Sequence, residues 1–511
     1  MPELEGDNSR VALGANYAIR APGLRGGVDR RAGRDLAVTA RTRSSALEAS
    51  ALDDALAAQG MRDVATIELT NLRTSSAPAA AAVIRSPAGD DALELETPDP
   101  GPGFDTVVLA VDEAGAVTWN FPLTDGNAIE PAATRGSGKT LRFRIARAPV
   151  QLPPTTSTQQ RGLIGAIGKK LLKVLVYPIT DLVVGAAADL FAHKWEERNR
   201  PYRVRTVTPD NFSTADVPAI QTGDTDQWKR LTVGGARALL FIHGTFSSVH
   251  SGFAGLSPDS VKTLSDNYGG RLFGFDHFTL SHSPAKNVEE FLSRVPGDVN
   301  LDVDIVCHSR GGLVARELVE RQARFGLGAE RLKIGKVVFV GVPNGGTALA
   351  EPDHMMHMID RFTSVLNVFP DNFVTAILES IITAVKVIGH GGLKSLDGLA
   401  AQNPRGSYLR ELAQESAGRS QYFGVTADFE PTGTPLSKLA LADGVMDRIF
   451  GDRKNDLVVP TAGVFEANGS PCFPLPQDNL LQLDAARGVI HTTYFRDEDV
   501  RRHLLTWLDA T

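Results

Sequence analysis

One stretch of the chain changes character at a serine, since residues Val303 to Leu318 read VDIVCHSRGGLVAREL. The residues before Ser309 are mostly apolar and β-branched, as in a buried strand, and those after it have the spacing of an amphipathic helix. A serine at this corner would present its hydroxyl where a strand ends. The backbone N–H of Arg310, at the helix N-terminus, would face negative charge developing on an attacked carbonyl group. These residue types indicate nucleophilic catalysis.

The corner resembles the nucleophile elbow, Gly-x-Ser-x-Gly, of the α/β-hydrolase superfamily and within it the lipases and esterases. Gly311 and Gly312 would let the helix approach the strand closely, and Cys307 stands where the first glycine is usual. His308 is expected to project to another side and to be structural. The resemblance implies an α/β-hydrolase fold, a mainly parallel sheet with helices on both faces and a helical lid.

Two further motifs of that family appear in the right order. Upstream, LLFIHGTFSS contains a His-Gly pair, His243 and Gly244, of the kind that forms the oxyanion loop after the third strand. The resemblance makes the backbone N–H of the next residue, Thr245, the second oxyanion donor beside that of Arg310. Downstream, a Pro-x-x-Gly-Thr turn runs from Pro343 to Thr347.

A serine hydroxyl needs a base, and the base needs a carboxylate to fix its tautomer. The family places its base where His491 lies, after the last strand-like run and before a closing amphipathic helix. Asp456, in DLVVP, matches the family pattern Asp-x-Val-Val-Pro, whereas Asp428 directly follows a strand-like run. We prefer Asp456 as the acid and retain Asp428 as the alternative. The chain order of Ser309, Asp456 and His491 is that of the family.

The resemblance implies hydrolysis of a carboxylic ester through an acyl-enzyme, with no cofactor and no metal. An apolar, proline-broken insertion at about 350–415 predicts a helical hairpin lid, which favours a substrate with an apolar acyl part. The same triad could instead act on a thioester, an amide, a phospholipid or a polyester.

Other polar residues allow two interpretations each. Asp276, His277 and Ser281 follow the predicted fourth strand, where they would either contact substrate or cap the next helix. His354 and His357 have a spacing that could place two metal ligands on one helix face. Without cysteines nearby, we expect no metal site there.

The elements that must position these residues are six apolar runs after residue 235: ARALLFIHG, GRLFGFDH, DVDIVCHS, GKVVFVGVP, SQYFGVTAD and LLQLDA. Most are continuous rather than alternating, which is typical of strands buried on both faces of a parallel sheet. We therefore predict an α/β-hydrolase domain at 235–511. Its site would lie at the carboxyl ends of the strands.

The preceding half predicts three segments. Residues 1–60 would be a loose Arg/Gly-rich arm with a short helix, and 61–150 a small β-sandwich. Residues 151–234 would be a linker with an amphipathic helical segment at 162–195. Its basic face would either pack on a neighbouring domain or contact a membrane surface. In the second case the chain would be a membrane- or partner-docking protein that carries the hydrolase as effector.

The composition is that of a globular protein and argues against several other classes of protein. The chain has 511 residues, 42% of them hydrophobic and 22% charged, as expected for a globular protein with several units. Its net charge of −7 argues against binding nucleic acid. With two cysteines, Cys307 and Cys472, a disulfide framework is not expected. The acidic start, MPELEGDNSR, lacks the pattern of a secretory signal, so we expect a cytoplasmic protein, and the sequence leaves its oligomeric state open.

Overall fold

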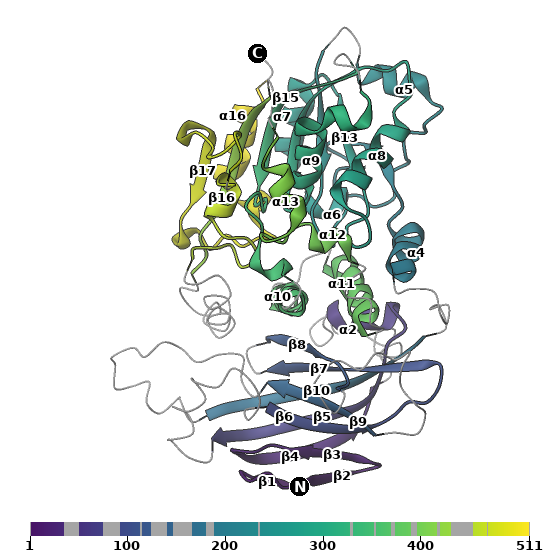
Figure 1. Ribbon diagram of the computed structural model, residues 1–511, viewed down its shortest axis with the longest axis vertical. Coiled ribbons are helices and arrows are strands. Elements are labelled where there is room, and N and C mark those ends of the chain that lie inside the picture. Colours follow the sequence, from purple (N-terminus) through teal and green to yellow (C-terminus); the bar gives the residue numbers. More distant parts are fainter. Residues whose placement is uncertain are drawn as a thin grey trace. The chain divides into compact units, whose positions relative to one another are not determined.

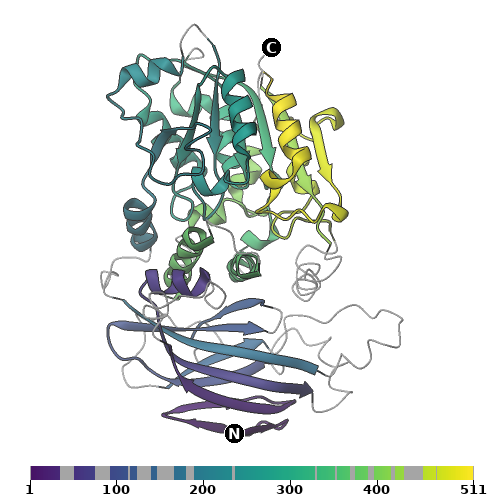
Figure 2. The same ribbon diagram turned by 180° about the vertical axis from the view of Figure 1, so that it is seen from behind.

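The chain forms two compact units, each assembled from separate stretches of the sequence (Figures 1 and 2). Unit 1 comprises Met1–Phe191, Ile359–Leu393 and Gly433–Val445, and unit 2 comprises Ala192–Met358, Lys394–Thr432 and Met446–Thr511. The computed structural model describes residues 2–34, 51–74, 92–112, 115–123, 140–146, 166–179, 189–232, 236–327, 331–351, 354–368, 374–389, 396–415, 420–430, 453–467 and 469–509.

Unit 2 is built on a seven-stranded sheet with the order β11-β13-β12-β14-β15-β16-β17. β11 runs antiparallel to β13, and the other neighbours in the sheet are parallel. The strands are β11 (Arg203–Thr206), β12 (Ala238–Ile242), β13 (Leu272–Asp276), β14 (Leu301–His308), β15 (Leu332–Val340), β16 (Gln421–Ala427) and β17 (Leu480–Leu483).

Helices cover both faces of this sheet (Figure 1). Leu240 of β12 belongs to a core cluster shared with α8 and α9, and its neighbour Leu239 belongs to a second cluster shared with α7 and α16. The α-helices of unit 2 are α4 (Asp189–Asn199, from Ala192 onward), α5 (Thr225–Arg230), α6 (Val249–Gly252), α7 (Pro258–Asn267), α8 (Pro284–Arg294), α9 (Gly311–Glu320), α12 (Asp397–Ala400), α13 (Ser407–Leu412), α15 (Ala462–Phe465) and α16 (Glu498–Trp507). Unit 2 therefore has the mainly parallel α/β architecture that the resemblance implied.

The start of this unit differs from the prediction of 235. β11 already belongs to the sheet, because Arg203 through Thr206 pair with β13. The segment predicted as linker and helix at 151–234 therefore contributes a strand. This strand was missed because its four residues, RVRT, carry one apolar side chain and two arginines, so they have little apolar signature.

Unit 1 contains two antiparallel sheets that share one hydrophobic core, in which Leu95 and Phe143 of one sheet pack with Leu69 and Val174 of the other. The six-stranded sheet has the order β1-β4-β5-β10-β7-β8 and the four-stranded sheet the order β2-β3-β6-β9. The strands are β1 (Glu3–Glu5), β2 (Val11–Gly14), β3 (Tyr17–Arg20), β4 (Leu24–Ala32), β5 (Arg62–Thr74), β6 (Ala92–Pro98), β7 (Phe104–Asp112), β8 (Val117–Asn120), β9 (Thr140–Ala146) and β10 (Ala166–Pro178).

The loose arm predicted for residues 1–60 is wrong. β1 to β4 lie within it, and β4 pairs along its length with β5. Leu24 and Val28 of β4 are fully buried, whereas arginines occupy exposed positions between and around them. β4 is ordered by pairing with a strand some forty residues later in the chain, and the Arg/Gly-rich composition of the segment does not predict this pairing. The short helix expected within 1–60 is present as α2 (Ala51–Ala58), and residues 35–50 lie outside the described residues.

The amphipathic helix predicted for 162–195 is also wrong over most of its described length. β10 is an interior strand of the six-stranded sheet, hydrogen-bonded to β5 and β7. Its lysines are engaged within unit 1: Lys169 pairs with Glu68, and Lys173 pairs with Asp53. The described residues 166–178 therefore form a strand in place of a helix with a basic face, and membrane or partner contact by 162–195 stays a prediction.

The insertion predicted as a lid is divided between the units. From Ile359 onward α10 (Met355–Val368) belongs to unit 1, as does α11 (Val374–Gly389), whereas α12 and α13 belong to unit 2. α11 packs against α2. Pro370, which breaks the apolar run of the insertion, lies outside the described residues. A covering role for these helices stays a prediction.

α10 closes an open edge of the six-stranded sheet. β8 is the last strand in that sheet, so its outer N–H and C=O groups need partners from elsewhere. Ser364 Oγ accepts from the N–H of Val117 at 2.9 Å, and Asp360 Oδ1 accepts from that of Trp119 at 2.8 Å. The indole N–H of Trp119 also donates to Thr363 Oγ1 at 3.0 Å. Side chains of the insertion thus complete the sheet edge.

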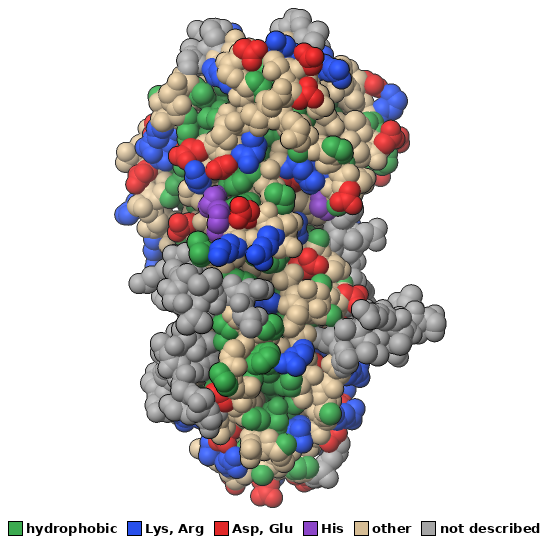
Figure 3. Space-filling view, turned by 90° about the vertical axis from the view of Figure 1, so that its right-hand side faces the viewer, with side chains coloured by type: hydrophobic (Ala, Val, Ile, Leu, Met, Phe, Trp, Pro, Cys, Tyr) green, Lys and Arg blue, Asp and Glu red, His purple; other side chains and the backbone are tan. Residues whose placement is uncertain are grey.

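The surface mixes charges of both signs. On the face drawn in Figure 3, Lys and Arg side chains are interspersed with Asp and Glu over the described residues. Among the helices that the structure describes, none is long and apolar enough to cross a membrane.

Candidate active site

Ser309 lies at the junction of β14 and α9 in a strained backbone conformation. Its φ of 52° falls in the left-handed region, which a side chain other than glycine rarely adopts. Its N–H donates to the carbonyl oxygen of Val340 at 3.0 Å, which anchors the turn to β15. A Cβ placed on Gly311 would lie 2.4 Å from the carbonyl oxygens of Ile242 and His243. The glycine after the turn therefore allows α9 to approach the end of β12.

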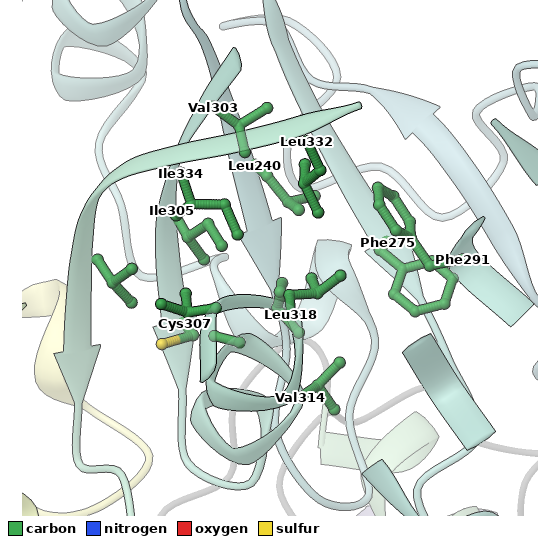
Figure 4. Packing of buried hydrophobic residues seen from close by; sticks show 14 of the residues in the cluster. Leu240, Phe275, Phe291, Val303, Ile305, Cys307, Val314, Leu318, Leu332 and Ile334 are labelled. Carbon is green, nitrogen blue, oxygen red and sulfur yellow. The ribbon is translucent and has the colours of Figure 1, made fainter. Parts of the chain in front are cut away.

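Cys307 occupies the position before His308 without disturbing this turn. Its side chain is fully buried and points into the core below the elbow, among residues of β14, β15 and α9 (Figure 4). Its thiol lies 3.3 Å from the carbonyl oxygen of Val338. Burial raises the pKa of this thiol well above its ordinary value, so Cys307 stays protonated and serves as a small core residue.

The structure brings together Ser309, His491 and Asp456. His491 Nε2 lies 2.9 Å from Ser309 Oγ, and His491 Nδ1 lies 2.8 Å from Asp456 Oδ2. None of the three residues is more than 2% exposed. The serine follows β14, and the other two come from loops after β16 and β17, so the three meet at the carboxyl ends of parallel strands. The hydrogen bonds form a continuous relay from hydroxyl to carboxylate.

Asp456 is held by four donors. The N–H groups of Val458 and Val459 donate to Oδ1 at 3.0 and 2.7 Å. The hydroxyl of Tyr494 donates to Oδ2 at 2.8 Å, beside His491. Burial opposes ionisation of this carboxyl, but His491 and these hydrogen bonds hold its pKa below the ordinary value. Asp456 is therefore an ionised partner for the imidazole.

The alternative acid, Asp428, lies at the end of β16 but has a different partner. Its Oδ2 lies 3.0 Å from Lys454 Nζ. The carboxylate of Asp456, in contrast, contacts the ring of His491 directly. Of the two candidates, the geometry favours Asp456.

The two proposed oxyanion donors lie on either side of the serine. Gly244, just before Thr245, is so close to the elbow that a Cβ there would lie 2.6 Å from the Cβ of Ser309. Within the described part of the chain, neither the N–H of Thr245 nor that of Arg310 donates to a protein acceptor. Both groups are thus available to a bound oxygen atom.

The side chain of Arg310 points away from this position. Its guanidinium is fully buried and donates to the carbonyl oxygens of Gly398 at 2.6 Å and of His282, and to Oδ1 of Asn287 at 2.9 Å. Burial lowers its pKa to about 10, which still leaves it charged at neutral pH. The side chain of Thr245 accepts from Gln402 Nε2 at 3.2 Å. α12 and the residues after it therefore brace both donor positions.

His243 holds the predicted oxyanion loop in the neutral form. Its Nε2 accepts from the N–H of His277 at 3.1 Å, so its proton sits on Nδ1, which donates to the carbonyl oxygen of Gly244 at 3.0 Å. Burial lowers its pKa to about 4. His308 is likewise structural: its Nε2 donates to the carbonyl oxygen of His491 at 2.9 Å, and burial lowers its pKa to about 3.

The other polar candidates have structural partners. Asp276 forms an ion pair with Arg203 at 2.8 Å, and Ser281 donates to Glu196 at 2.7 Å. Glu196 also accepts the N–H groups of residues 279–281, and thereby fixes the loop after β13. His354 Nδ1 lies 3.2 Å from the carbonyl oxygen of Ala348. Among the described residues, no group of histidine, cysteine and acidic side chains could hold a metal ion.

Three contributors to this site were missed from the sequence. Tyr494 and Gln402 act through side-chain contacts with distant residues, which no local motif marks. Gly341 makes room for the relay: its φ is 56°, and a Cβ there would lie 3.3 Å from Asp456 Oδ2 and 3.4 Å from His491 Nδ1. The glycine near the end of the strand-like run GKVVFVGVP was the signal in the sequence that other groups approach the backbone closely there.

A family model described as "Domain of unknown function (DUF7379)" matches residues 199–509, more than half of the chain. The chain belongs to this family. The DUF7379 region begins just before β11, and it contains every residue of the relay. No protein with a curated description matches the chain.

Solved structures similar to the DUF7379 protein include a lipase of Bacillus licheniformis (14% identity, 54% of this chain and 93% of that chain, TM-score 0.33). Two others are EstA of Clostridium botulinum (14%, 54% and 87%, TM-score 0.38) and lipase 1 of Pelosinus fermentans (14%, 54% and 99%, TM-score 0.36). Because identity and TM-score are low in these three cases, the function proposed below rests on the hydrogen bonds of the site.

Proposed function

We propose that this DUF7379 protein is a serine hydrolase that cleaves carboxylic esters through an acyl-enzyme. The observation that carries the proposal is the relay from Ser309 Oγ to His491 Nε2 and from His491 Nδ1 to Asp456 Oδ2, with distances of 2.9 and 2.8 Å. A strained serine at a strand-to-helix turn, a buried base and an ionised carboxylate are the parts that activate a hydroxyl for attack.

In the first step His491 Nε2 takes the proton of Ser309, and Oγ attacks the carbonyl carbon of the ester. The negative charge moves to the carbonyl oxygen, where the N–H groups of Thr245 and Arg310 stabilise it. His491 then gives its proton to the alkoxide, and the alcohol leaves. Asp456 stays ionised throughout and stabilises the protonated imidazole.

In the second step water replaces the alcohol. His491 takes a proton from the water, hydroxide attacks the acyl carbon, and the second tetrahedral intermediate collapses. The bond between the acyl carbon and Ser309 Oγ breaks, and Oγ regains its proton from His491. The products are the alcohol and the carboxylic acid, and no cofactor takes part.

The substrate class is the finer part of the proposal. We retain an ester with an apolar acyl part as the first class to test, as the sequence led us to expect. Thioesters, amides, phospholipid acyl groups and polyesters pass through the same tetrahedral intermediate, so the relay serves them equally. Comparing substrates therefore tests this part separately from the relay itself.

The first test compares wild type with Ser309→Ala on p-nitrophenyl esters from acetate to palmitate. We expect turnover by wild type and loss of at least a thousandfold in kcat in the variant. Ser260→Ala is the matched control, because Ser260 is a buried serine on α7 that bonds Ser257 outside the relay. It should retain activity.

A fluorophosphonate probe separates a weak substrate from an inactive serine. If wild type turns over none of the esters but is labelled at Ser309, the ester class is wrong and the nucleophile stands. If wild type is neither active nor labelled, while its thermal unfolding is cooperative, the proposed function is wrong.

A further inference from the structure

One oxygen of Asp456 receives two side-chain donors. Oδ2 accepts from His491 Nδ1 and from the hydroxyl of Tyr494, each at 2.8 Å. The other oxygen, Oδ1, accepts hydrogen bonds from the N–H groups of residues 458 and 459. The reaction described above uses His491 and leaves Tyr494 without a role, although Tyr494 is only 1% exposed.

The chain places Tyr494 with little freedom to move. It starts a short 3₁₀ turn, Tyr494–Arg496, three residues after His491. Its ring meets those of His491 and His308 edge-on, with ring centres 6.4 Å apart in both cases. Gly341 faces the ring on another side, where a Cβ would lie 2.7 Å from Cε2 of the tyrosine. Packing of the ring therefore fixes the phenol independently of the hydrogen bond from its hydroxyl to Asp456.

We propose that Tyr494 is a positioning residue of the reaction: its hydroxyl fixes Oδ2 of Asp456 against His491 Nδ1 and shares the negative charge of that oxygen. The inference rests on the proposed function. Burial, and then the neighbouring Asp456, raise the pKa of Tyr494 well above its ordinary value, so the phenol stays a donor across the working range. Tyr494 acts through Asp456 and takes no part in bond making.

Tyr494→Phe removes the hydroxyl and keeps the ring. We expect kcat to fall about tenfold with KM unchanged, because the lost bond orients the base and does not bind substrate. The acid limb of kcat/KM should move to higher pH by about half a unit, since an Oδ2 with one donor fewer stabilises the protonated imidazole more strongly. His308 also lies against His491, but burial keeps it neutral over this range.

Tyr268→Phe is the matched control. The hydroxyl of Tyr268 donates to Oδ2 of another buried carboxylate, Asp304, at 2.7 Å, and the tyrosine is likewise 1% exposed. This variant loses the same type of bond away from the relay. We expect a comparable fall in melting temperature, with the acid limb and kcat unchanged.

The outcomes separate this inference from the proposed function. If wild type turns over and Ser309→Ala does not, but Tyr494→Phe has the kcat and acid limb of wild type, the role of Tyr494 is refuted and the hydrolase stands. A lower kcat with an unmoved acid limb also refutes it, because a merely structural role would produce that result. If wild type is inert and unlabelled, the proposed function itself fails.

A second measurement covers failure of Tyr494→Phe to fold. Replacing the tyrosines by 3-fluorotyrosine keeps the ring shape and makes every phenol a stronger donor. The acid limb should then move to lower pH, opposite to the phenylalanine variant. An acid limb that does not move in the fluorinated protein refutes the inference.

Discussion

At the scale of single residues, Ser309 and Gly341 shape the site through backbone conformations with positive φ. Ser309 tolerates such a conformation although it has a side chain, because β15 and the oxyanion loop hold the turn from both sides. Gly341 has the same type of conformation for a different reason, since its missing side chain is the space that the relay uses. Ser309 thus presents its hydroxyl, and Gly341 leaves room for the side chains of Asp456 and His491.

Gly341→Ala should therefore damage activity more than stability. Its Cβ would lie 2.7 Å from the ring of Tyr494 and 3.3 Å from Asp456 Oδ2, so the carboxylate or the tyrosine must shift. We expect kcat to fall at least a hundredfold. Gly270→Ala provides the comparison, because it has φ of 79° and nothing within 4 Å of an added Cβ. Equal activity losses in the two variants would show that backbone strain alone is responsible.

The choice between the two carboxylates gives a second prediction. Asp456→Asn should lower kcat by about a thousandfold or more, because an amide cannot hold the imidazole in the tautomer that accepts the serine proton. Asp428→Asn should stay within about threefold of wild type, since Asp428 pairs with Lys454. Steady-state kinetics of both variants on one ester decide the matter. A larger loss in Asp428→Asn would reverse the assignment.

At the scale of elements, α10 and β8 depend on each other. The hydroxyl of Ser364 accepts a hydrogen bond from the buried backbone N–H of Val117 on this edge strand. Ser364→Ala therefore leaves that N–H without its acceptor. We expect a loss of about 1–3 kcal/mol in the free energy of unfolding and faster amide exchange at Val117. Ser380→Ala on α11 is the control, because that hydroxyl bonds its own helix. Unchanged exchange at Val117 would contradict this account of the edge.

The elements also show what a sequence can predict. Ser309 and Asp456 were found because each follows a strand within a short motif, and His491 because it lies between the last strand-like run and the closing helix. All of these signals are local. The strand β10 was not predicted, because the spacing of Leu171 and Leu175 suits a helix as well as a strand. The partners that decide between them, β5 and β7, lie some sixty to a hundred residues earlier. The role of Tyr494 needed the side-chain geometry, since only a folded chain brings it to Asp456.

At the scale of the whole molecule, buried neutral histidines make unit 2 sensitive to acid. Burial lowers the pKa of His243 to about 4 and that of His308 to about 3, against roughly 6.5 in an unfolded chain. Between pH 6.5 and these values the unfolded state binds more protons than the folded state, so stability is full above pH 6.5 and falls below it. Each of the two histidines should contribute a loss of about 2 kcal/mol at pH 5.

Thermal unfolding from pH 8 to pH 4 measures this effect. The melting temperature should be flat above pH 7 and decline steeply below pH 6. His308→Gln should flatten the decline, because a glutamine amide can still donate to the carbonyl oxygen of His491 and does not titrate. His503→Gln on α16 serves as the control. A decline of the same steepness in His308→Gln and wild type would remove His308 from the explanation.

The division of unit 1 among separate stretches has a consequence for synthesis on the ribosome. Val117 and its partner Ser364 are 247 positions apart in the chain. At roughly 5–20 residues per second, translation needs on the order of ten to fifty seconds to cover that distance. A hairpin pairs within microseconds, so β8 can join its neighbour long before α10 has been made. The nascent β-rich unit therefore carries an open strand edge until residue 364 of the 511 has been made.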